Sequence, residues 1–168
     1  RNVKPKTFGT IGVSIVGAGL FTRALLLPAL SRVPGISLKG VATATGATAN
    51  HMAKKFGFAY DTTEYQRLLA DPDTEAIFIL TRHNLHAKMV IEALEAGKHV
   101  FVEKPLCLNE EQLKEIISTY NQINEKDQIN HRNQILMVGF NRRFAPAAKI
   151  VNDFFSTVNQ PIAVSIRF

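Results

Sequence analysis

The sequence predicts an α/β fold with a doubly wound parallel sheet, and three observations lead to this prediction. First, short continuous apolar runs of strand length recur along the chain, such as GVSIV at 12–16 and AIFIL at 76–80. Second, segments with apolar residues at helical spacing separate these runs, as in residues 85–96. Third, glycines follow the predicted helices, for example Gly57 and Gly97. Strands that alternate with helices in this way are typical of right-handed βαβ units.

The expected elements follow from apolar periodicity and from breaker residues. Strands are expected at 12–16, 38–43, 76–80, 99–102 and 135–140. Helices are expected at 20–31, 48–56, 64–70, 85–96 and 109–120. Asn109 is the predicted N-cap of the last helix, because Gln112 follows three residues later in a capping-box pattern. The polar residues 121–134 are either the end of that helix or an exposed loop.

The composition fits a water-soluble domain with a sizeable core. The chain has 168 residues, 46% of them hydrophobic, and its apolar runs are interrupted. They are far shorter than the ~18 residues of a membrane span. The single Cys107 excludes a disulfide framework and a cysteine-rich zinc site, and no secretory signal pattern opens the chain. We therefore expect a cytoplasmic location and no membrane partner.

The net charge of +6 is consistent with an anionic partner. However, the lysines and arginines are scattered, with no dense basic run and no interleaved aromatic residues. This distribution argues against nucleic acid and favours a small molecule that carries phosphate.

The two ends of the chain differ in character from its middle. Residues 1–10 are polar and resemble a linker, and residues 164–168 have strand character although the chain stops there. We therefore expect a linker-like segment at 1–10, a dinucleotide-binding domain at 11–145, and the start of a further domain at 146–168. The chain is then expected to be a piece of a longer polypeptide.

The first predicted strand runs directly into a glycine-containing turn, Gly17-Ala18-Gly19-Leu20-Phe21, and then into a helix. In a dinucleotide site the first glycine makes the tight turn, and the second allows the backbone to approach the pyrophosphate. The helix that follows supplies N–H donors. Thr22 replaces the third glycine of the G-x-G-x-x-G pattern, which affects helix packing more than phosphate binding. Two glycines also occur in ordinary turns, but this pair stands in the strand–turn–helix context that the site requires.

The end of the second predicted strand, VATAT at 41–45, carries no acidic residue. An NAD site usually has Asp or Glu here for the ribose, and the first acid after it is Asp61. Thr45 is a candidate cofactor contact. A small uncharged strand end leaves room for a 2′-phosphate, which favours NADP slightly over NAD, although no arginine stands beside it. A methyltransferase, a further alternative, would also want an acid at this position.

Three polar segments follow later predicted strands, and ligands of open α/β sheets bind at the carboxyl ends of strands. They are Thr81 to His86, then Glu103-Lys104-Pro105, then Asn141-Arg142-Arg143. His83 and His86 have a spacing that a metal could use, but no cysteine or carboxylate accompanies them, so no metal is expected. For Lys104 the simplest interpretation is an ion pair with Glu103 or another neighbour, and the alternative is a reactive site.

Four stretches together resemble the Gfo/Idh/MocA oxidoreductases: GAG at 17–19, TRHNLH at 81–86, EALEAGKHVFVEKPL at 92–106 and VGFNRRFAPA at 138–147. The similarity extends from Val13 over nearly the whole chain, and E-K-P is its most specific element. GVATATGATANHMAKKFGF and VGFNRRFAPA look most like the branch in which this unit follows a zinc-dependent alcohol-dehydrogenase-like domain.

The resemblance implies a Rossmann domain of an NAD- or NADP-dependent dehydrogenase that oxidises a hydroxyl of a sugar, cyclitol or related alcohol. Lys104 would then assist proton transfer near the nicotinamide, Glu103 would orient it and Pro105 would fix the turn. A lysine partly removed from water exchanges protons more readily near neutrality.

For the remaining positions the resemblance implies contacts with the cofactor. Residues 81–86, including Thr81, His83 and His86, would line the cofactor, although the family often has proline where Arg82 stands. Asn141 and Arg142 would close over the nicotinamide.

The family also has a C-terminal α+β domain that supplies substrate contacts, and this chain stops before it. We therefore expect the chain to bind dinucleotide but to turn over little alone, and the full-length protein to be a homo-oligomer. The alternative is a non-enzymatic module of the same fold that senses nucleotide or regulates transcription, which would need the glycine turn but not Lys104.

Overall fold

The structure is a computed structural model that describes residues 9–127, 133–161, 163 and 165. The chain order of its elements is β1 (Ile11–Val16), η1 (Thr22–Leu26), α1 (Leu27–Leu30), β2 (Ile36–Ala42), α2 (Gly46–Phe56), β3 (Tyr60–Thr62), α3 (Gln66–Ala70), β4 (Ala76–Ile79), η2 (His83–Leu85), α4 (His86–Glu95), β5 (His99–Glu103), α5 (Glu110–Asp127), β6 (Leu136–Gly139), η3 (Asn141–Phe144) and α6 (Pro146–Phe155). The segment η1 is a π-helical turn, whereas η2 and η3 are 3₁₀ turns.

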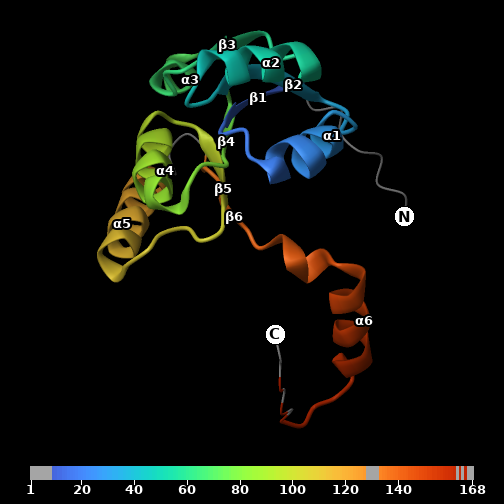
Figure 1. Ribbon diagram of the computed structural model, residues 1–168. Coiled ribbons are helices and arrows are strands. Elements are labelled where there is room, and N and C mark those ends of the chain that lie inside the picture. The colour runs from blue at the N-terminus through green and yellow to red at the C-terminus, as the bar shows by residue number, and fades with distance from the viewer. Residues whose placement is uncertain (1–8, 128–132, 162, 164, 166–168) are drawn as a thin grey trace.

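The strands form one six-stranded sheet in the order β3-β2-β1-β4-β5-β6, and every neighbouring pair is parallel. The chain winds outward from β1 in one direction and from β4 in the other (Figure 1). This is a doubly wound sheet whose strand order reverses between β1 and β4. The predicted fold class is therefore confirmed, and all carboxyl ends of the strands lie along the same edge.

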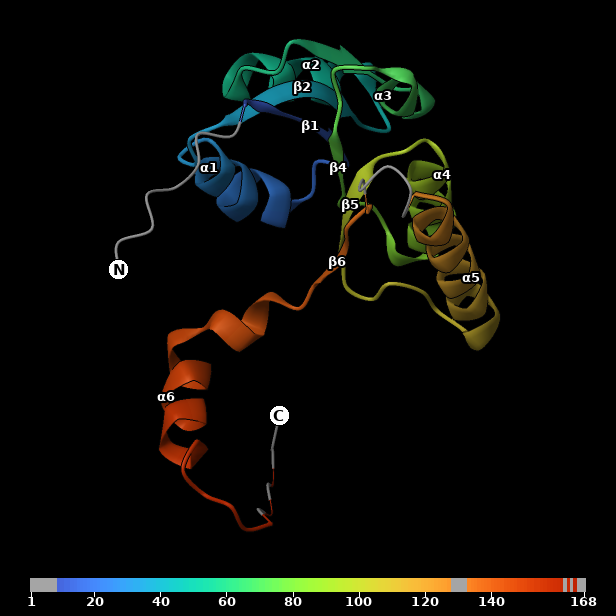
Figure 2. The same cartoon turned by 180° about the vertical axis from the view of Figure 1, so that it is seen from behind.

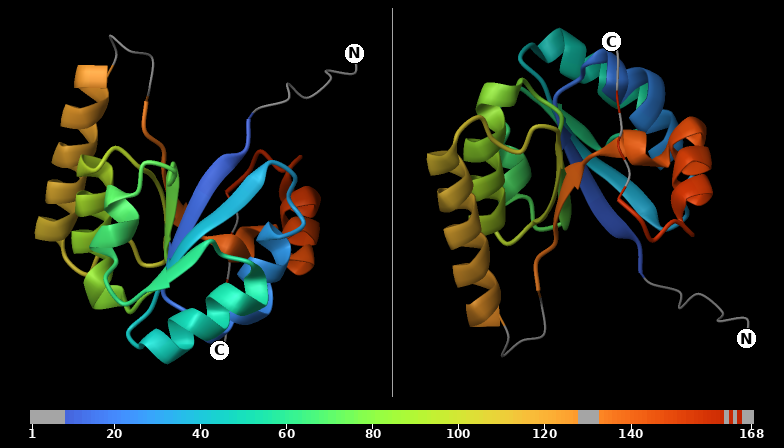
Figure 3. Two further views of the ribbon diagram at one scale, coloured as in Figure 1. Left: turned by 90° about the horizontal axis from the view of Figure 1, so that it is seen from above. Right: turned by 90° about the horizontal axis from the view of Figure 1, so that it is seen from below.

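Helices cover both faces of the sheet, as the views along its edge show (Figure 3). On one face, α3, α4 and α5 pack on a core that includes Leu68, Val90 and Ile116. On the other face, α1 and α2 pack on a second core that includes Leu27 and Met52. β1 is buried along nearly its whole length, whereas in β4 and β5 buried residues alternate with less buried ones. Cover from both layers favours the continuous apolar runs at 12–16 and 76–80.

The five predicted strands are confirmed with shifts of one or two residues at their ends. The predicted C-cap glycines Gly57 and Gly97 both have φ of +77°. Asn109 caps α5 as predicted, accepting the N–H of Gln112 at 2.9 Å, while Gln112 accepts the N–H of Leu108. Sequence analysis did not predict β3, η3 or α6.

Helix α5 continues past Tyr120 to Asp127, so residues 121–127 of the polar stretch are the helix end, which is one of the two alternatives that the sequence left open. Its apolar stripe extends one turn further than the sequence suggested, since Tyr120 and Ile123 both pack against the core. Of the polar stretch 121–134, residues 128–132 lie outside the described residues, as do residues 1–8 and most of the predicted strand at 164–168.

Helix α6 is set apart from the sheet in opposite views (Figures 1 and 2). It has no buried residue, and its apolar side chains include Ile150 and Phe154, which are 70% and 72% exposed. Nor does any helix in the described part of the chain have the length and apolar character that a membrane crossing needs.

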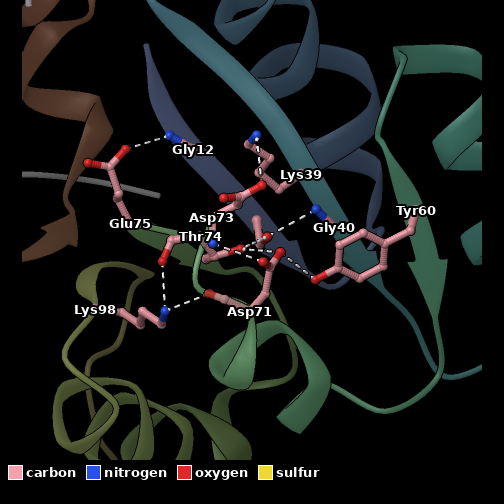
Figure 4. A network of polar contacts seen from close by, with 10 residues as sticks. Gly12, Lys39, Gly40, Tyr60, Asp71, Asp73, Thr74, Glu75 and Lys98 are labelled. Atoms are coloured by element: carbon pink, nitrogen blue, oxygen red, sulfur yellow. Dashed lines mark hydrogen bonds and ion pairs between the residues drawn. The ribbon is translucent and has the colours of Figure 1, made fainter. Parts of the chain in front are cut away.

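The amino ends of β1, β4 and β5 are joined by a dense polar network (Figure 4). Its centre is Asp71, whose Oδ2 accepts hydrogen bonds from the Tyr60 hydroxyl at 2.8 Å and from the Thr74 hydroxyl at 3.1 Å. The Lys98 ammonium, in a residue only 8% exposed, donates to the carbonyls of Asp71 and Thr74, both at 2.8 Å. The Ser14 hydroxyl, 2.7 Å from the Thr74 hydroxyl, accepts the N–H of Gly40.

The network shifts the pKa values of its members in different directions. Burial and then the bond to Asp71 raise the pKa of Tyr60 to about 12. Burial alone would raise the pKa of Asp71, but the N–H of Asp73 and the hydroxyls of Tyr60 and Thr74 outweigh it, so this pKa is lowered. Burial lowers the pKa of Lys98, and the nearby Asp71 charge opposes that shift.

Candidate functional site

A pocket of about 700 Å³ opens at the carboxyl ends of β1, β2 and β4, where the strand order reverses. Its lining comes from the turn after β1, the end of β2, the segment after β3, and the segment after β4. The lining residues are Val16, Gly17, Ala18, Gly19, Ala42, Thr43, Ala44, Thr63, Tyr65, Leu80, Thr81, Arg82, Leu85 and Met89. The reversal point is the position at which open α/β sheets bind their ligands.

The two glycines of the first turn have different roles. Gly17 has φ of +101°, and a Cβ there would collide with the carbonyl of Leu80 at the end of β4. Only glycine therefore fits at this tight crossing. A Cβ atom added at Gly19 would have no protein atom within 4 Å, so the backbone there faces open space. A ligand can thus approach the main chain closely at Gly19.

The helix that follows the turn begins next to Gly19, whose carbonyl accepts the N–H of Arg23 at 3.1 Å. Leu20 is exposed and Phe21 is half-buried, and neither lines the pocket. Thr22, which replaces the third glycine of the pattern, is buried at the start of the π-helical turn. The packing around the helix that follows β1 therefore accommodates the threonine side chain at a position where the G-x-G-x-x-G pattern has a glycine.

The end of β2 is small and uncharged. Thr43 and Ala44 line the pocket, and the Thr43 hydroxyl donates to the carbonyl of Thr45 at 2.8 Å. Thr45 itself is the N-cap of α2, where its hydroxyl accepts the N–H of Thr48 and donates to the Thr48 hydroxyl. Asp61 is bonded to Asn50 at 3.3 Å and is not among the lining residues.

The residues predicted to contact the cofactor in the segment after β4 differ in their exposure and position. Thr81 lines the pocket, and His83 is exposed on η2. His86 is fully buried at the start of α4, with Nδ1 2.7 Å from the carbonyl of Pro105 and Nε2 3.2 Å from the carbonyl of Thr81. A neutral imidazole carries one N–H and donates to one of these carbonyls, whereas a protonated ring donates to both. His86 thus joins the end of β4 to the turn after β5.

That turn contains Glu103, Lys104 and Pro105 directly after the buried part of β5. The Lys104–Pro105 peptide bond is cis, and the Lys104 side chain is exposed. Glu103 Oε2 accepts the N–H of Lys104 at 3.2 Å, and no ion pair of the described residues includes Lys104. The simple interpretation as an ion-paired turn is therefore not supported. The described residues also leave Lys104 in contact with water, contrary to the expected desolvation.

The other carboxylate oxygen of Glu103, Oε1, is buried and has no hydrogen-bond partner among the described residues. Glu103 Oε1 lies beside Gly139 at the end of β6, and a Cβ atom added at Gly139 would be 3.0 Å from this oxygen. Asn141 and Arg142 follow β6 on η3 and are exposed. The predicted residues therefore share the carboxyl edge of the sheet, but they fall into a pocket group at β1, β2 and β4 and a second group at β5 and β6.

Sequence reasoning missed several lining residues. Thr63 and Tyr65 follow β3, a strand that was not predicted, and Met89 lies on the inner face of α4. Arg82 and Leu85, which lie within the segment 81–86 that was expected to line the cofactor, do line the pocket. Within the described ranges, no group of three or more His, Cys, Asp or Glu side chains could hold a metal ion.

Comparison with known proteins also indicates an NAD-binding Rossmann fold. A family model described as "Oxidoreductase family, NAD-binding Rossmann fold" (Gfo/Idh/MocA) matches residues 11–131. Levoglucosan dehydrogenase of Pseudarthrobacter phenanthrenivorans is 30% identical over 151 residues, which cover 86% of this chain and 36% of that protein. The scyllo-inositol 2-dehydrogenase (NAD(+)) of Bacillus subtilis is 33% identical over 118 residues, covering 70% of this chain and 32% of that protein.

A solved structure of KijD10, a 3-ketoreductase from Actinomadura kijaniata in complex with NADP and TDP-benzene, aligns with a TM-score of 0.76. It is 26% identical and covers 88% of this chain and 42% of the other. The chain thus spans only about a third of the length of the two curated relatives above. The expectation of NAD or NADP as cofactor is confirmed at the level of the family. With this fold, this glycine turn and this match, the chain belongs to the Gfo/Idh/MocA family of oxidoreductases.

Proposed function

We propose that this chain is the cofactor-binding part of an NAD(P)-dependent dehydrogenase that acts on a hydroxyl of a sugar, cyclitol or related alcohol. The observation that carries the proposal is the shared edge of the sheet. The glycine turn after β1 and the Lys104 turn after β5 lie at this edge, and His86 links the Lys104 turn to the pocket-lining Thr81. The names of the relatives, which include a levoglucosan and an inositol dehydrogenase, support this substrate class.

The pocket fits a dinucleotide in several respects. Its volume of about 700 Å³ suits a ligand of this size. The open space at Gly19 admits a phosphate to the backbone, and a Cβ at this residue would take part of that space. The apolar walls at Leu80, Leu85 and Met89 offer a surface for a flat heterocycle.

The chemistry needs a hydride acceptor and a proton acceptor. A bound nicotinamide supplies the first, since it takes the hydride from the carbon that bears the hydroxyl. The neutral amine of Lys104 would accept the proton of that hydroxyl as the carbonyl forms, and the ammonium returns it in the reverse reaction. Glu103 holds the Lys104 backbone through its N–H, and the buried His86 fixes the turn through the Pro105 carbonyl.

Because Lys104 is exposed in the described structure, a substrate must be enclosed by further groups before proton transfer is efficient. We infer that the chain by itself binds cofactor and turns over slowly. Asn141 and Arg142, on the neighbouring η3, are then candidates for contacts at the nicotinamide end.

The test replaces Lys104 by Ala and by Met in the natural polypeptide that contains these residues. Turnover should fall about 10²- to 10⁴-fold, the range for loss of a general acid–base group, while cofactor affinity stays within about two-fold. Lys114→Ala is the matched control, since this lysine is exposed and its one ion pair within the described residues is with Glu110 on α5. Retention of turnover without Lys104 would contradict its role in proton transfer, whereas no turnover of any alcohol by the parent protein would support the non-enzymatic alternative instead.

A further inference from the structure

The cofactor pocket contains one formal charge among its described lining residues, and that charge is Arg82. The other lining residues are glycines, aliphatic residues, threonines and one tyrosine. A pocket that recognises NAD through its ribose diol usually carries a carboxylate at the end of β2. Here that position holds Thr43 and Ala44, and Asp61 is bonded to Asn50 outside the lining. The charge pattern is therefore opposite to that of an NAD-type ribose site.

Topology brings Arg82 into the same pocket as the end of β2. Arg82 follows β4, Ala44 follows β2, and β1 lies between these strands in the sheet. Both residues line the same pocket, and they come from the ends of the two strands that flank β1. Because the adenosine ribose lies over the end of β2 in this class of fold, the small Ala44 leaves space beside the ribose and Arg82 supplies a cation across it.

Arg82 is free to bind an anion, and its backbone is held in place. None of the ion pairs within the described ranges includes it, and its side chain is exposed. Its carbonyl accepts the N–H of Leu85 at 3.0 Å, so the residue is anchored at the start of η2. A guanidinium is well suited to phosphate, because it offers paired N–H donors and a planar face that stacks on an aromatic ring.

We propose that Arg82 binds the 2′-phosphate of NADP(H) and is the residue that gives this site its preference for NADP(H) over NAD(H). The proposal rests on the proposed function, since it requires that the pocket holds a dinucleotide. It resolves the choice that the sequence left open, where no arginine stood beside the end of β2. The arginine follows β4 instead and lines the same pocket.

The test is titration of the chain with NADPH and with NADH in a buffer free of phosphate, followed by calorimetry and by nicotinamide fluorescence. We expect NADPH to bind about ten- to a hundred-fold more tightly, as a charge-assisted contact of this kind contributes. Arg82→Gln should reduce this ratio to about two by weakening NADPH alone, and Arg82→Lys should retain part of it. Raising the salt concentration should weaken NADPH more than NADH.

Lys88→Gln is the matched control, because it removes a positive charge from nearby α4 outside the pocket lining. This variant should leave the ratio unchanged, and thermal melting of each variant checks that the fold is intact. Equal affinities of the parent chain for both cofactors would overturn the role of Arg82 while leaving the proposed function in place. The same holds if Arg82→Gln weakens both equally. Failure of both cofactors to bind would instead contradict the proposed function itself.

Discussion

The two ends of the same sheet differ in how their polar groups are used. At the amino end, the half-buried Asp71 and the buried Lys98 each make several hydrogen bonds to neighbouring segments (Figure 4). At the carboxyl end, the backbone at Gly19 faces open space, Lys104 is exposed and Glu103 Oε1 lacks a partner among the described residues. One end holds the strands together, and the other presents groups to a ligand.

The comparison teaches where stability and binding can be separated by mutation. A polar group whose partners are all within the protein contributes to folding, and its loss leaves other buried groups unpaired. A group that faces a pocket contributes little to folding and much to binding. Substitutions at the amino end should therefore lower stability without changing cofactor affinity, and the reverse should hold at Gly19.

The largest effect on stability is expected for Asp71→Ala. This change removes the carboxylate that accepts the Tyr60 and Thr74 hydroxyls, and it leaves the buried Lys98 without its nearby negative charge. We expect the free energy of unfolding to fall by about 2–4 kcal/mol, measured by urea denaturation. NADPH affinity, measured where the variant is folded, should stay within about two-fold.

Asp73→Ala is the matched control, because its side chain is exposed and makes a single 3.6 Å contact with Lys39. It should cost less than about 1 kcal/mol. If the two aspartates cost the same, the network at the amino end would not be the source of the stability. Since the pKa of Asp71 is lowered by folding, its contribution is present above the unfolded pKa and is lost as the pH falls. The difference between Asp71→Asn and the parent should therefore shrink below about pH 4.

The second prediction concerns the glycine turn at the carboxyl end. Gly19→Ala should weaken NADPH binding about ten-fold, because the new Cβ occupies space through which a phosphate approaches the backbone. Its unfolding free energy should change by less than about 0.5 kcal/mol, since the Cβ meets no protein atom within 4 Å.

Gly17→Ala provides the contrast within the same turn. Its φ of +101° and the collision with the Leu80 carbonyl should lower both stability and affinity. If Gly19→Ala is folded and its affinity for NADPH is unchanged, the assignment of this turn as the phosphate site is contradicted.

The features that the sequence could predict are local ones. Apolar runs indicated β1, β4 and β5, and the GAG turn was visible because a single residue separates its two glycines. The features that it could not predict depend on contacts between distant segments. His86 was expected to line the cofactor, but its ring lies buried between the carbonyls of Thr81 and Pro105. Helix α5 extends beyond Tyr120, and its residue Ile123 packs against the core.

The candidate site shows the same division. Thr43 and Ala44 revealed a strand end without an acid, but the arginine that faces the same pocket follows a different strand. No local pattern joins Ala44 to Arg82, because their proximity arises from the position of β1 between β2 and β4. The shared edge could be predicted from the topology, whereas the set of side chains that lines one pocket could not.

The smallest effect, and the sharpest in pH, is expected for Tyr60→Phe. The hydroxyl donates to Asp71 at 2.8 Å and the residue is only half-buried, so its loss should cost about 1 kcal/mol at pH 7. Folding raises the pKa of Tyr60 from 10.0 to about 12, first through burial and then through the bond to Asp71. The folded state therefore holds this proton more tightly than the unfolded state does.

Stability from this group is fully present below pH 10 and is lost as the pH rises towards 12. The parent chain should lose more stability than Tyr60→Phe over this interval, so that the two denaturation midpoints converge. Lys98 is present in both proteins, and its own titration largely cancels in the difference. Tyr120→Phe is the control for a general tyrosine effect, because the Tyr120 hydroxyl donates to the Gln134 carbonyl and makes no contact with Asp71. Midpoints that stay parallel from pH 9 to pH 12 would place the Tyr60 proton outside the network, and the amino end would then be held by Asp71, Thr74 and Lys98 alone.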